Sequence, residues 1–213
     1  VWTREELERM NDICTRHHVV IVSDEIHNEL VLPGYRYTPL AAVSEACLEN
    51  SVTLTSPSKS FNIAGLQMAN IITKNAAWRR RIERVVNIFE ICDVNPFAPV
   101  AIQAAYNESE EWIDALNLYI RNNYELLRAF CRERLPKWQV MHMEGTYLAW
   151  VDISRTGMGA DRLAEKIMEQ AKVKLNSGTL YGAEAGKDYL RINLACRRTL
   201  LETALQRISK CCG

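Results

Sequence analysis

The chain has 213 residues, 26 lysines and arginines against 26 aspartates and glutamates, and 48% hydrophobic residues. These values are typical of a globular protein of one or two domains, and they exclude a disordered, collagen-like or coiled-coil chain. The formal net charge of zero provides no excess of positive charge for binding a phosphate backbone, so we expect no nucleic-acid partner.

The apolar runs are short and the cysteines are irregularly spaced. Runs such as Val19–Val22 are too short to cross a bilayer, and no signal-peptide pattern opens the chain, which predicts a cytoplasmic protein with no membrane contact. The 7 cysteines form no CxxC pair, which favours reduced thiols and no metal site. Because the chain starts with Val1 and a helix signal follows at once, we expect a piece of a longer protein.

The first predicted element is a helix. Thr3 and Glu6 have the spacing of a capping box, in which each side chain accepts a hydrogen bond from the backbone N–H of the other residue. Leu7, Met10 and Cys14 follow at helical spacing, which predicts a helix from about Thr3 to His17.

Two short strands follow, and each ends in a polar cluster. Val19–Val22 is a continuous β-branched run, which predicts a parallel strand buried on both faces and ended by Ser23-Asp24-Glu25. Ser51–Thr55 is a second strand that stops at Ser56-Pro57-Ser58-Lys59. Open α/β sheets bind ligands beyond the carboxyl ends of their strands, so these clusters are candidates for a site.

The rest of the chain alternates between helices and strands, with a change of character after one long helix. A strand at Met68–Thr73 and a helix at Ala76–Phe89 precede a break at Asn95–Pro99. The later predicted elements are a helix at Ser109–Arg134, strands at Trp138–Met143 and Tyr147–Ile153, a helix at Asp161–Ala171, strands at Lys172–Leu175 and Tyr189–Leu194, and a helix at Thr199–Lys210 opened by a second capping box at Thr199–Glu202. We predict an α/β protein of two parts, residues 1–105 and 106–213, the second of them a small α+β domain with the long helix that leads into it.

Three residues could carry chemistry. Lys59 follows one strand and Asp24 ends the other, so an amine and a carboxylate could reach opposite sides of one bound ring. Strand alternation separates Arg191 from Leu190 and Ile192, and a guanidinium there could bind a carboxylate through two hydrogen bonds. Taken singly, a lysine beside serines is most often an exposed ammonium, and a strand arginine most often faces water.

With their flanking residues these three positions resemble a known family. Ser23-Asp24-Glu25-Ile26-His27, Ser56-Pro57-Ser58-Lys59-Ser60-Phe61-Asn62 and Arg191-Ile192-Asn193 look like the aminotransferase class I/II group of fold type I pyridoxal-phosphate enzymes. Within that group the chain is most similar to the MalY/PatB-type carbon–sulfur lyases. The resemblance covers nearly the whole chain and implies the C-terminal part of the large cofactor-binding domain in residues 1–105 and the small domain in 106–213.

The resemblance implies a role for each residue. Lys59 would hold pyridoxal phosphate covalently and take the proton from the substrate Cα. Asp24 would pair with the pyridinium nitrogen and keep it protonated. Ser56 and Ser58 would give their hydroxyls to the cofactor phosphate, and Arg191 would hold the substrate α-carboxylate.

Two positions depart from the aminotransferase pattern. His27 stands where many aminotransferases have a tyrosine, which favours the lyase branch and places His27 in the cofactor site, although it could also merely pack beneath the ring. Gln67 stands where an arginine often binds the phosphate. Family members are also longer, so we expect a C-terminal fragment that lacks parts of the cofactor site and is inactive by itself.

The resemblance predicts an enzyme, a pyridoxal-phosphate-dependent β-lyase that cleaves cystathionine, cysteine or an S-substituted cysteine to a thiol, pyruvate and ammonia. The full-length protein is expected to be a homodimer that acts on a small amino-acid substrate. One alternative is an aminotransferase on the same scaffold. Another is a non-catalytic regulatory or interaction protein that keeps the fold.

Overall fold

The computed structural model describes residues 1–212, which form two compact units. The first unit is Val1–Ala115, and the second begins at Leu116, inside the long helix α5 (Glu110–Arg134). The sequence places the boundary at residue 105, before this helix, and the domain roles given to the two parts stay predictions.

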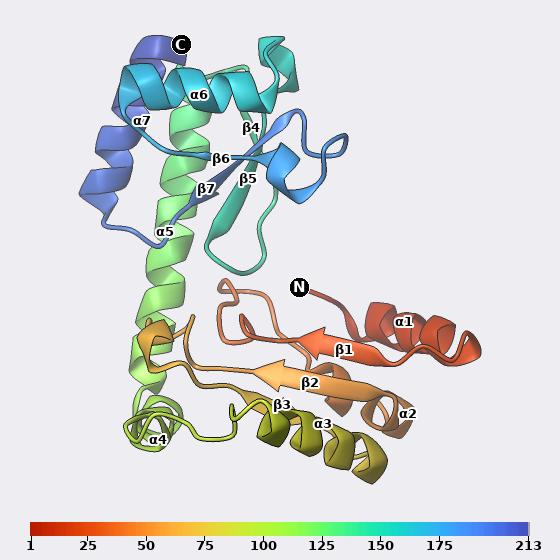
Figure 1. The fold of residues 1–213 in the computed structure, drawn as a ribbon. Coiled ribbons are helices and arrows are strands. Elements are labelled where there is room, and N and C mark those ends of the chain that lie inside the picture. The colour runs from red at the N-terminus through yellow and green to blue at the C-terminus, as the bar shows by residue number, and fades with distance from the viewer. Residues whose placement is uncertain (213) are drawn as a thin grey trace. The chain divides into compact units, whose positions relative to one another are not determined.

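The first unit is built on a three-stranded sheet in the order β1-β2-β3 (Figure 1). β1 (Ile21–Asp24) and β2 (Ser51–Thr55) are parallel, and β3 (Asn70–Ile72) is antiparallel to β2. β2 has its predicted bounds. β3 is shorter than predicted, because the carbonyl of Met68 accepts a hydrogen bond from the hydroxyl of Ser56 at 2.7 Å instead of joining the ladder.

Helix α1 (Arg4–Arg16) begins where the capping box predicts. The backbone N–H of Glu6 donates to Oγ1 of Thr3 at 3.2 Å, and the N–H of Thr3 donates to Oε2 of Glu6 at 2.8 Å. These reciprocal bonds satisfy two N–H groups that have no partner inside the helix.

One face of the sheet is covered by an apolar cluster from α1 and the segment after β1. The cluster consists of Leu7, Leu40, Val43 and Cys47, and Ile21 of β1 packs against it.

The short helix α2 (Glu45–Glu49) lies in this covering layer and is not predicted from the sequence. Its five residues are too few to show a helical period. Its start is fixed by Ser44, whose Oγ accepts from the backbone N–H of Cys47 at 3.2 Å.

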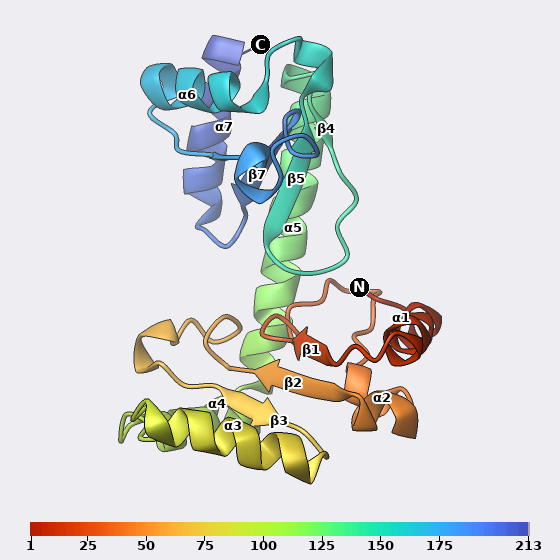
Figure 2. The same ribbon diagram turned by 45° about the vertical axis from the view of Figure 1, so that its right-hand side comes forward.

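The opposite face of this sheet is largely exposed. Val20 is 42% exposed and Val22 is 63% exposed. They line an apolar groove of about 450 Å³ together with Val52, Leu54 and Ile71 of the sheet and Trp78, Arg81 and Ile82 of helix α3 (Ala76–Ile88). Figure 2 shows α3 running beside the sheet. The prediction that β1 is buried on both faces is therefore wrong. β1 has two apolar side chains, and only that of Ile21 packs against the covering cluster.

Two further helices complete the first unit. α3 (Ala76–Ile88) matches its predicted range to within one residue and is capped by Asn75, whose Oδ1 accepts from two backbone N–H groups. α4 (Ala98–Glu108) is missing from the predicted elements, which treat Asn95–Pro99 as a break. Pro99 lies in the first turn of α4, where a proline is tolerated because an N–H there has no helical acceptor.

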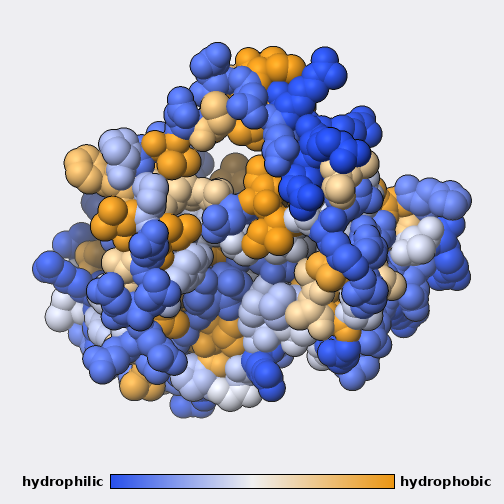
Figure 3. All heavy atoms as spheres, turned by 90° about the horizontal axis from the view of Figure 1, so that it is seen from below, coloured by the Kyte–Doolittle hydropathy of each residue, from blue (hydrophilic) through white to orange (hydrophobic). Residues whose placement is uncertain are grey.

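Large apolar side chains are exposed between the end of α3 and the start of α4. In the view from below, hydrophobic residues lie at the surface among hydrophilic ones (Figure 3). Those more than 60% exposed in this segment are Ile88, Phe89, Ile91, Phe97 and Val100. Such a concentration is typical of a surface that another chain or another part of the protein covers.

The second unit has an antiparallel sheet in the order β4-β5-β7-β6. The strands are β4 (Gln139–Val140), β5 (Leu148–Asp152), β6 (Asn176–Ser177) and β7 (Tyr189–Asn193). Two helices pack on one another in this unit, α6 (Ala160–Ala171) and α7 (Arg198–Cys212).

Two sequence predictions in the second unit are wrong. No strand forms at Lys172–Leu175, because Lys172 adopts a left-handed conformation that ends α6, and the strand comes later, as β6. The second capping box does not form either. α7 already includes Arg198, and the carbonyl of Arg197 accepts the first helical bonds, so Thr199 lies inside the helix.

The core of the second unit is fully enclosed. Six of its apolar side chains have 0% exposure: Ile120, Leu127, Ile153, Ile167, Leu190 and Leu194.

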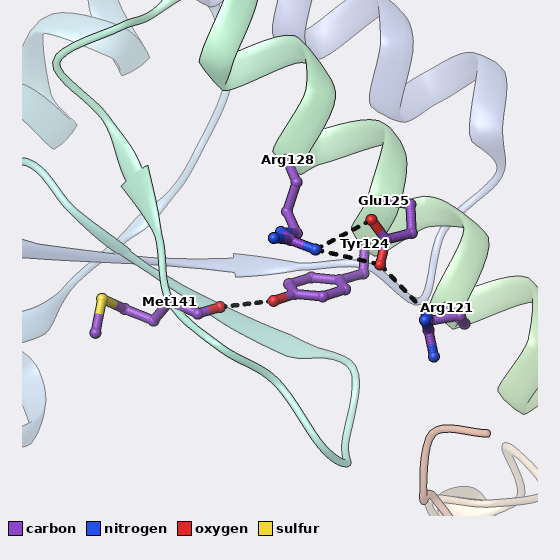
Figure 4. A network of polar contacts seen from close by, with 5 residues as sticks. All are labelled: Arg121, Tyr124, Glu125, Arg128 and Met141. Carbon is purple, nitrogen blue, oxygen red and sulfur yellow. Dashed lines mark hydrogen bonds and ion pairs between the residues drawn. The ribbon is translucent and has the colours of Figure 1, made fainter. Parts of the chain in front are cut away.

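Polar contacts of α5 lie beside this core. Tyr124 of α5 donates its hydroxyl to the carbonyl of Met141 at 3.0 Å, and Glu125 pairs with Arg121 and Arg128 on the helix surface (Figure 4). The tyrosine thus fastens the segment after β4 to α5.

Among residues 1–212, no helix is both long enough and apolar enough to cross a lipid bilayer.

Candidate active site

The carboxyl ends of β1 and β2 meet at one edge of the first sheet. Asp24, the last residue of β1, is in register with Leu54. The next backbone N–H, that of Glu25, donates to the carbonyl of Leu54 at 2.8 Å. β2 ends at Thr55 and leads directly into the turn with Lys59. The predicted placement of both polar clusters at one sheet edge is therefore confirmed.

Asp24 and Lys59 are both exposed at this edge. The backbone N–H of Ile26 donates to Oδ1 of Asp24 at 3.2 Å, an Asx turn that reverses the chain after β1. The turn after β2 is held by two backbone bonds, from Phe61 N–H to the carbonyl of Pro57 at 2.9 Å and from Ile63 N–H to that of Ser58 at 3.1 Å.

The pKa of the His27 imidazole is affected by both Lys59 and Asp24. Burial lowers the pKa of its imidazole, the positive charge of Lys59 lowers it further, and the negative charge of Asp24 opposes the change. The amine and the carboxylate therefore lie within electrostatic range of the same half-buried imidazole, which is held neutral at pH 7. A carboxylate, an amine and a neutral imidazole together can hold and move a proton.

The two predicted phosphate ligands lie in the same turn. The hydroxyl of Ser56 donates to the carbonyl of Met68 at 2.7 Å and accepts from the backbone N–H of Ser58 at 3.1 Å, and the side chain is only 2% exposed. A bond from Ser56 to a phosphate would require this donor to change partner. Ser58 is half-buried, and Gln67 is exposed with a left-handed φ of 50°. The roles of Ser56 and Ser58 at a phosphate stay predictions.

Glu25 is a buried carboxylate that sequence reasoning misses. It is 9% exposed and accepts hydrogen bonds from the hydroxyl of Ser23 at 2.8 Å, from the N–H of Leu40 at 3.1 Å and from the hydroxyl of Tyr37. Burial and this contact raise the pKa of Tyr37. Glu25 thus fixes the loop that starts at Asp24, and the only sequence signal for it is a second acid directly after the strand.

Arg191 belongs to the second unit, in the middle of β7, where it pairs in register with Trp150 on one side and Asn176 on the other. Its guanidinium carbon lies 4.3 Å from the centroid of the Tyr181 ring. The hydroxyl of Tyr181 accepts from the side-chain amide of Asn176 at 2.9 Å. This cation–π contact holds the guanidinium next to the ring, and its N–H groups are donors that suit a carboxylate.

Similarity to known proteins agrees with this arrangement. A model of the aminotransferase class I and II family matches residues 1–208. The chain belongs to this family. Cystathionine β-lyase PatB of Bacillus subtilis is 38% identical over 207 residues, covering 97% of this chain and 53% of PatB. Protein MalY of Escherichia coli is 34% identical over 205 residues, covering 95% of this chain and 51% of MalY.

Solved structures of the family have the same fold. Cystalysin of Treponema denticola, whose crystal structure contains a pyridoxal 5'-phosphate cofactor, matches with a TM-score of 0.89 and 32% identity, covering 99% of this chain and 53% of cystalysin. The predicted α/β fold and the likeness to MalY/PatB-type lyases are confirmed. The chain spans about half the length of these aminotransferase class I and II relatives.

Proposed function

We propose that the whole protein is a pyridoxal-phosphate-dependent carbon–sulfur β-lyase that cleaves cystathionine, cysteine or an S-substituted cysteine to a thiol, pyruvate and ammonia. The observation that carries the proposal is the pair of parallel strands that end in Asp24 and in the turn of Lys59 at one sheet edge. The names of PatB as a cystathionine β-lyase and of cystalysin as a protein that contains the cofactor support it.

The chemistry of this edge fits pyridoxal phosphate. The cofactor has an aldehyde that an amine can bind, a ring nitrogen that a carboxylate can keep protonated, and a phosphate that hydroxyl and N–H groups can hold. Lys59, Asp24 and the serine pair Ser56 and Ser58 provide these groups on two adjoining segments. When bound, the cofactor supplies an electron sink that makes loss of the substrate Cα proton possible.

Each side chain then has a defined task. Lys59 holds the cofactor and moves the proton at the substrate Cα, because it is an exposed amine at the edge where the ring would lie. Asp24 holds a proton at the ring nitrogen. His27 lines the site as a neutral imidazole, since burial and Lys59 lower its pKa. Arg191, whose guanidinium carbon lies 4.3 Å from the centre of the Tyr181 ring, binds the substrate α-carboxylate and so orients the Cα bonds.

The exposed apolar residues between Ile88 and Val100 support assembly with further protein surface. We propose a homodimer for the full-length protein, as the resemblance implies. A cytoplasmic location is also proposed, on the basis of the composition and the cysteine pattern.

The decisive experiment is an assay of pyruvate release from cystathionine by the full-length protein, with borohydride reduction to test for a pyridoxyl group on Lys59. We expect pyruvate, a label on Lys59, and a loss of rate of about 10²–10⁴-fold in Lys59→Ala, the usual contribution of an acid–base group. Lys74→Ala is the matched control, because Lys74 is an exposed lysine paired with Glu49 at 2.8 Å.

The other outcomes separate the alternatives. Amino transfer to a keto acid without pyruvate would identify an aminotransferase. A protein that is never labelled on Lys59 would be a binding or regulatory protein on the same fold.

A further inference from the structure

The residue after Lys59 is held from two directions. Ser60 has 0% exposure, although Lys59 beside it is exposed. The hydroxyl of Ser60 donates to Oε2 of Glu29 at 2.6 Å, and its carbonyl accepts from Nε1 of Trp112 at 3.0 Å. The side chain and the carbonyl of one turn residue are thus both fixed by residues distant in the sequence.

The Glu29 contact joins the two loops of the candidate site. Glu29 follows Asp24 by five residues in the loop after β1, and Ser60 lies in the turn after β2. The bond from the hydroxyl to the carboxylate is charge-assisted and short, and bonds of this class are about twice as strong as neutral ones. It therefore links the segment that carries the carboxylate to the segment that carries the amine.

Aromatic packing supports the same turn. The rings of Phe61 and Tyr106 meet edge to face, with centroids 5.9 Å apart and planes at 87°. Burial and then the charge of Glu29 raise the pKa of Tyr106 to about 12. The carboxylate of Glu29 thus holds Ser60 directly and also acts on the ring that packs against Phe61.

We propose that Glu29 is a positioning residue which, through Ser60, fixes the turn of Lys59 relative to Asp24. This inference rests on the proposed function, because it assigns Glu29 to the geometry of the cofactor-binding lysine. A lysine side chain is long and flexible, so the position of its amine depends on how firmly the backbone at its base is held. A misplacement of about 1 Å in an active site can cost about 10²-fold in rate.

The test uses the full-length protein with three substitutions. Glu29→Ala removes the acceptor, Glu29→Gln keeps an acceptor oxygen without the charge, and Glu8→Ala is the control because Glu8 is an exposed glutamate paired with Arg4 at 3.3 Å. Three quantities are measured: kcat per borohydride-trapped Lys59, KM, and the exchange rates of the Phe61 and Ile63 amides, whose hydrogen bonds define the turn.

We expect Glu29→Ala to lower kcat per trapped lysine by about 10- to 100-fold, the worth of a hydrogen bond to a charged group, with KM changed less than about threefold. The two turn amides should exchange at least about tenfold faster, and Glu29→Gln should recover part of both effects, because a neutral acceptor makes the weaker bond. Glu8→Ala should behave as the unsubstituted protein. A purely structural role would lower the trapped fraction without changing the rate per trapped lysine.

If Glu29→Ala does not fold, Ser60→Ala makes the same test from the donor side. Where both fold, the double variant should be no slower than either single variant, because the two residues act through one bond. The inference is overturned if kcat per trapped lysine and amide exchange in the Glu29→Ala and Ser60→Ala variants match the Glu8→Ala control. Failure of the proposed function looks different: the unsubstituted protein carries no pyridoxyl label, while the turn amides still respond to Glu29→Ala.

Discussion

The two units differ in how completely their sheets are covered. In the second unit the strand residues Ala149, Val151 and Leu190 have 0% exposure. In the first unit Val22 is 63% exposed and Ile71 is 48% exposed, and the strand register places both on the same face of the sheet. One unit therefore buries its apolar strand residues by itself, whereas the other leaves one sheet face open.

This difference shows where the stability of each unit originates. Burial of apolar side chains dominates the folding free energy, and the second unit has this burial throughout its core. In the first unit the apolar cluster against the sheet is small, and polar contacts such as those of Glu25 add to it. The candidate cofactor site lies in this less covered unit, which fits a chain that spans about half the length of its relatives.

The largest expected effect is on the closed core. Leu190→Ala should lower the unfolding free energy of the second unit by about 2–5 kcal/mol, because Leu190 is fully buried in β7 and its truncation leaves a cavity. Val22→Ala in the first unit should change stability by less than about 0.5 kcal/mol. Urea unfolding followed by amide exchange reports each unit separately. Equal costs for the two substitutions would show that the face around Val22 is covered.

A polar substitution tests the first unit. Glu25→Ala should destabilise it by about 2–3 kcal/mol, because the half-buried Tyr37 hydroxyl and the buried Leu40 N–H lose their acceptor. Tyr37→Phe removes one donor only and should cost less. The same urea experiment measures both, and a cost for Glu25→Ala no greater than that of the exposed Glu8→Ala would contradict the role given to this carboxylate.

Buried polar bonds also contribute in the second unit. Asn123 has 0% exposure, and its side-chain amide donates to the carbonyls of Leu194 at 3.0 Å and Cys196 at 3.1 Å. Asn123→Ala should cost about 1–2 kcal/mol, less than Leu190→Ala, because the two carbonyls lose a donor but little volume is removed. A cost above that of Leu190→Ala would reverse the order of apolar and polar contributions in this unit.

The smallest expected effect is on the pKa of His27. This pKa is a measure of the charges in the candidate site before cofactor is added. Its pKa should lie below the ordinary value of about 6.5, should rise in Lys59→Ala and should fall further in Asp24→Asn. Because the folded state binds this proton less readily than the unfolded state, the contribution to stability is complete above pH 6.5 and is lost as the pH falls through the folded-state pKa.

Imidazole NMR signals measure the shift directly. Lys74→Ala is the control, since Lys74 pairs with Glu49 on the surface. An unchanged His27 pKa in both site variants would mean that Lys59 and Asp24 do not share its surroundings.

Local patterns predict some elements well and others not at all. The capping box at Thr3 and the strand Ser51–Thr55 need only neighbouring residues, and both form as predicted. The box at Thr199 fails although its residues fit, because α7 starts before it. Exposure of the Val22 side chain is also invisible locally, since a β-branched run has the same sequence whether or not a second layer covers it.

Consecutive residues are enough to identify the family, the two strands and the residue types at their ends, because a motif and a strand period are local patterns. The contacts that hold those residues come from segments far apart in the chain. Ser60 forms hydrogen bonds with Glu29 and Trp112, which are 31 and 52 positions away in the chain. The ring of Tyr181 contacts both the guanidinium of Arg191 and the ring of Trp150, the neighbour of Arg191 in the sheet. Contacts between such distant residues depend on how the layers pack, and no local sequence pattern predicts them.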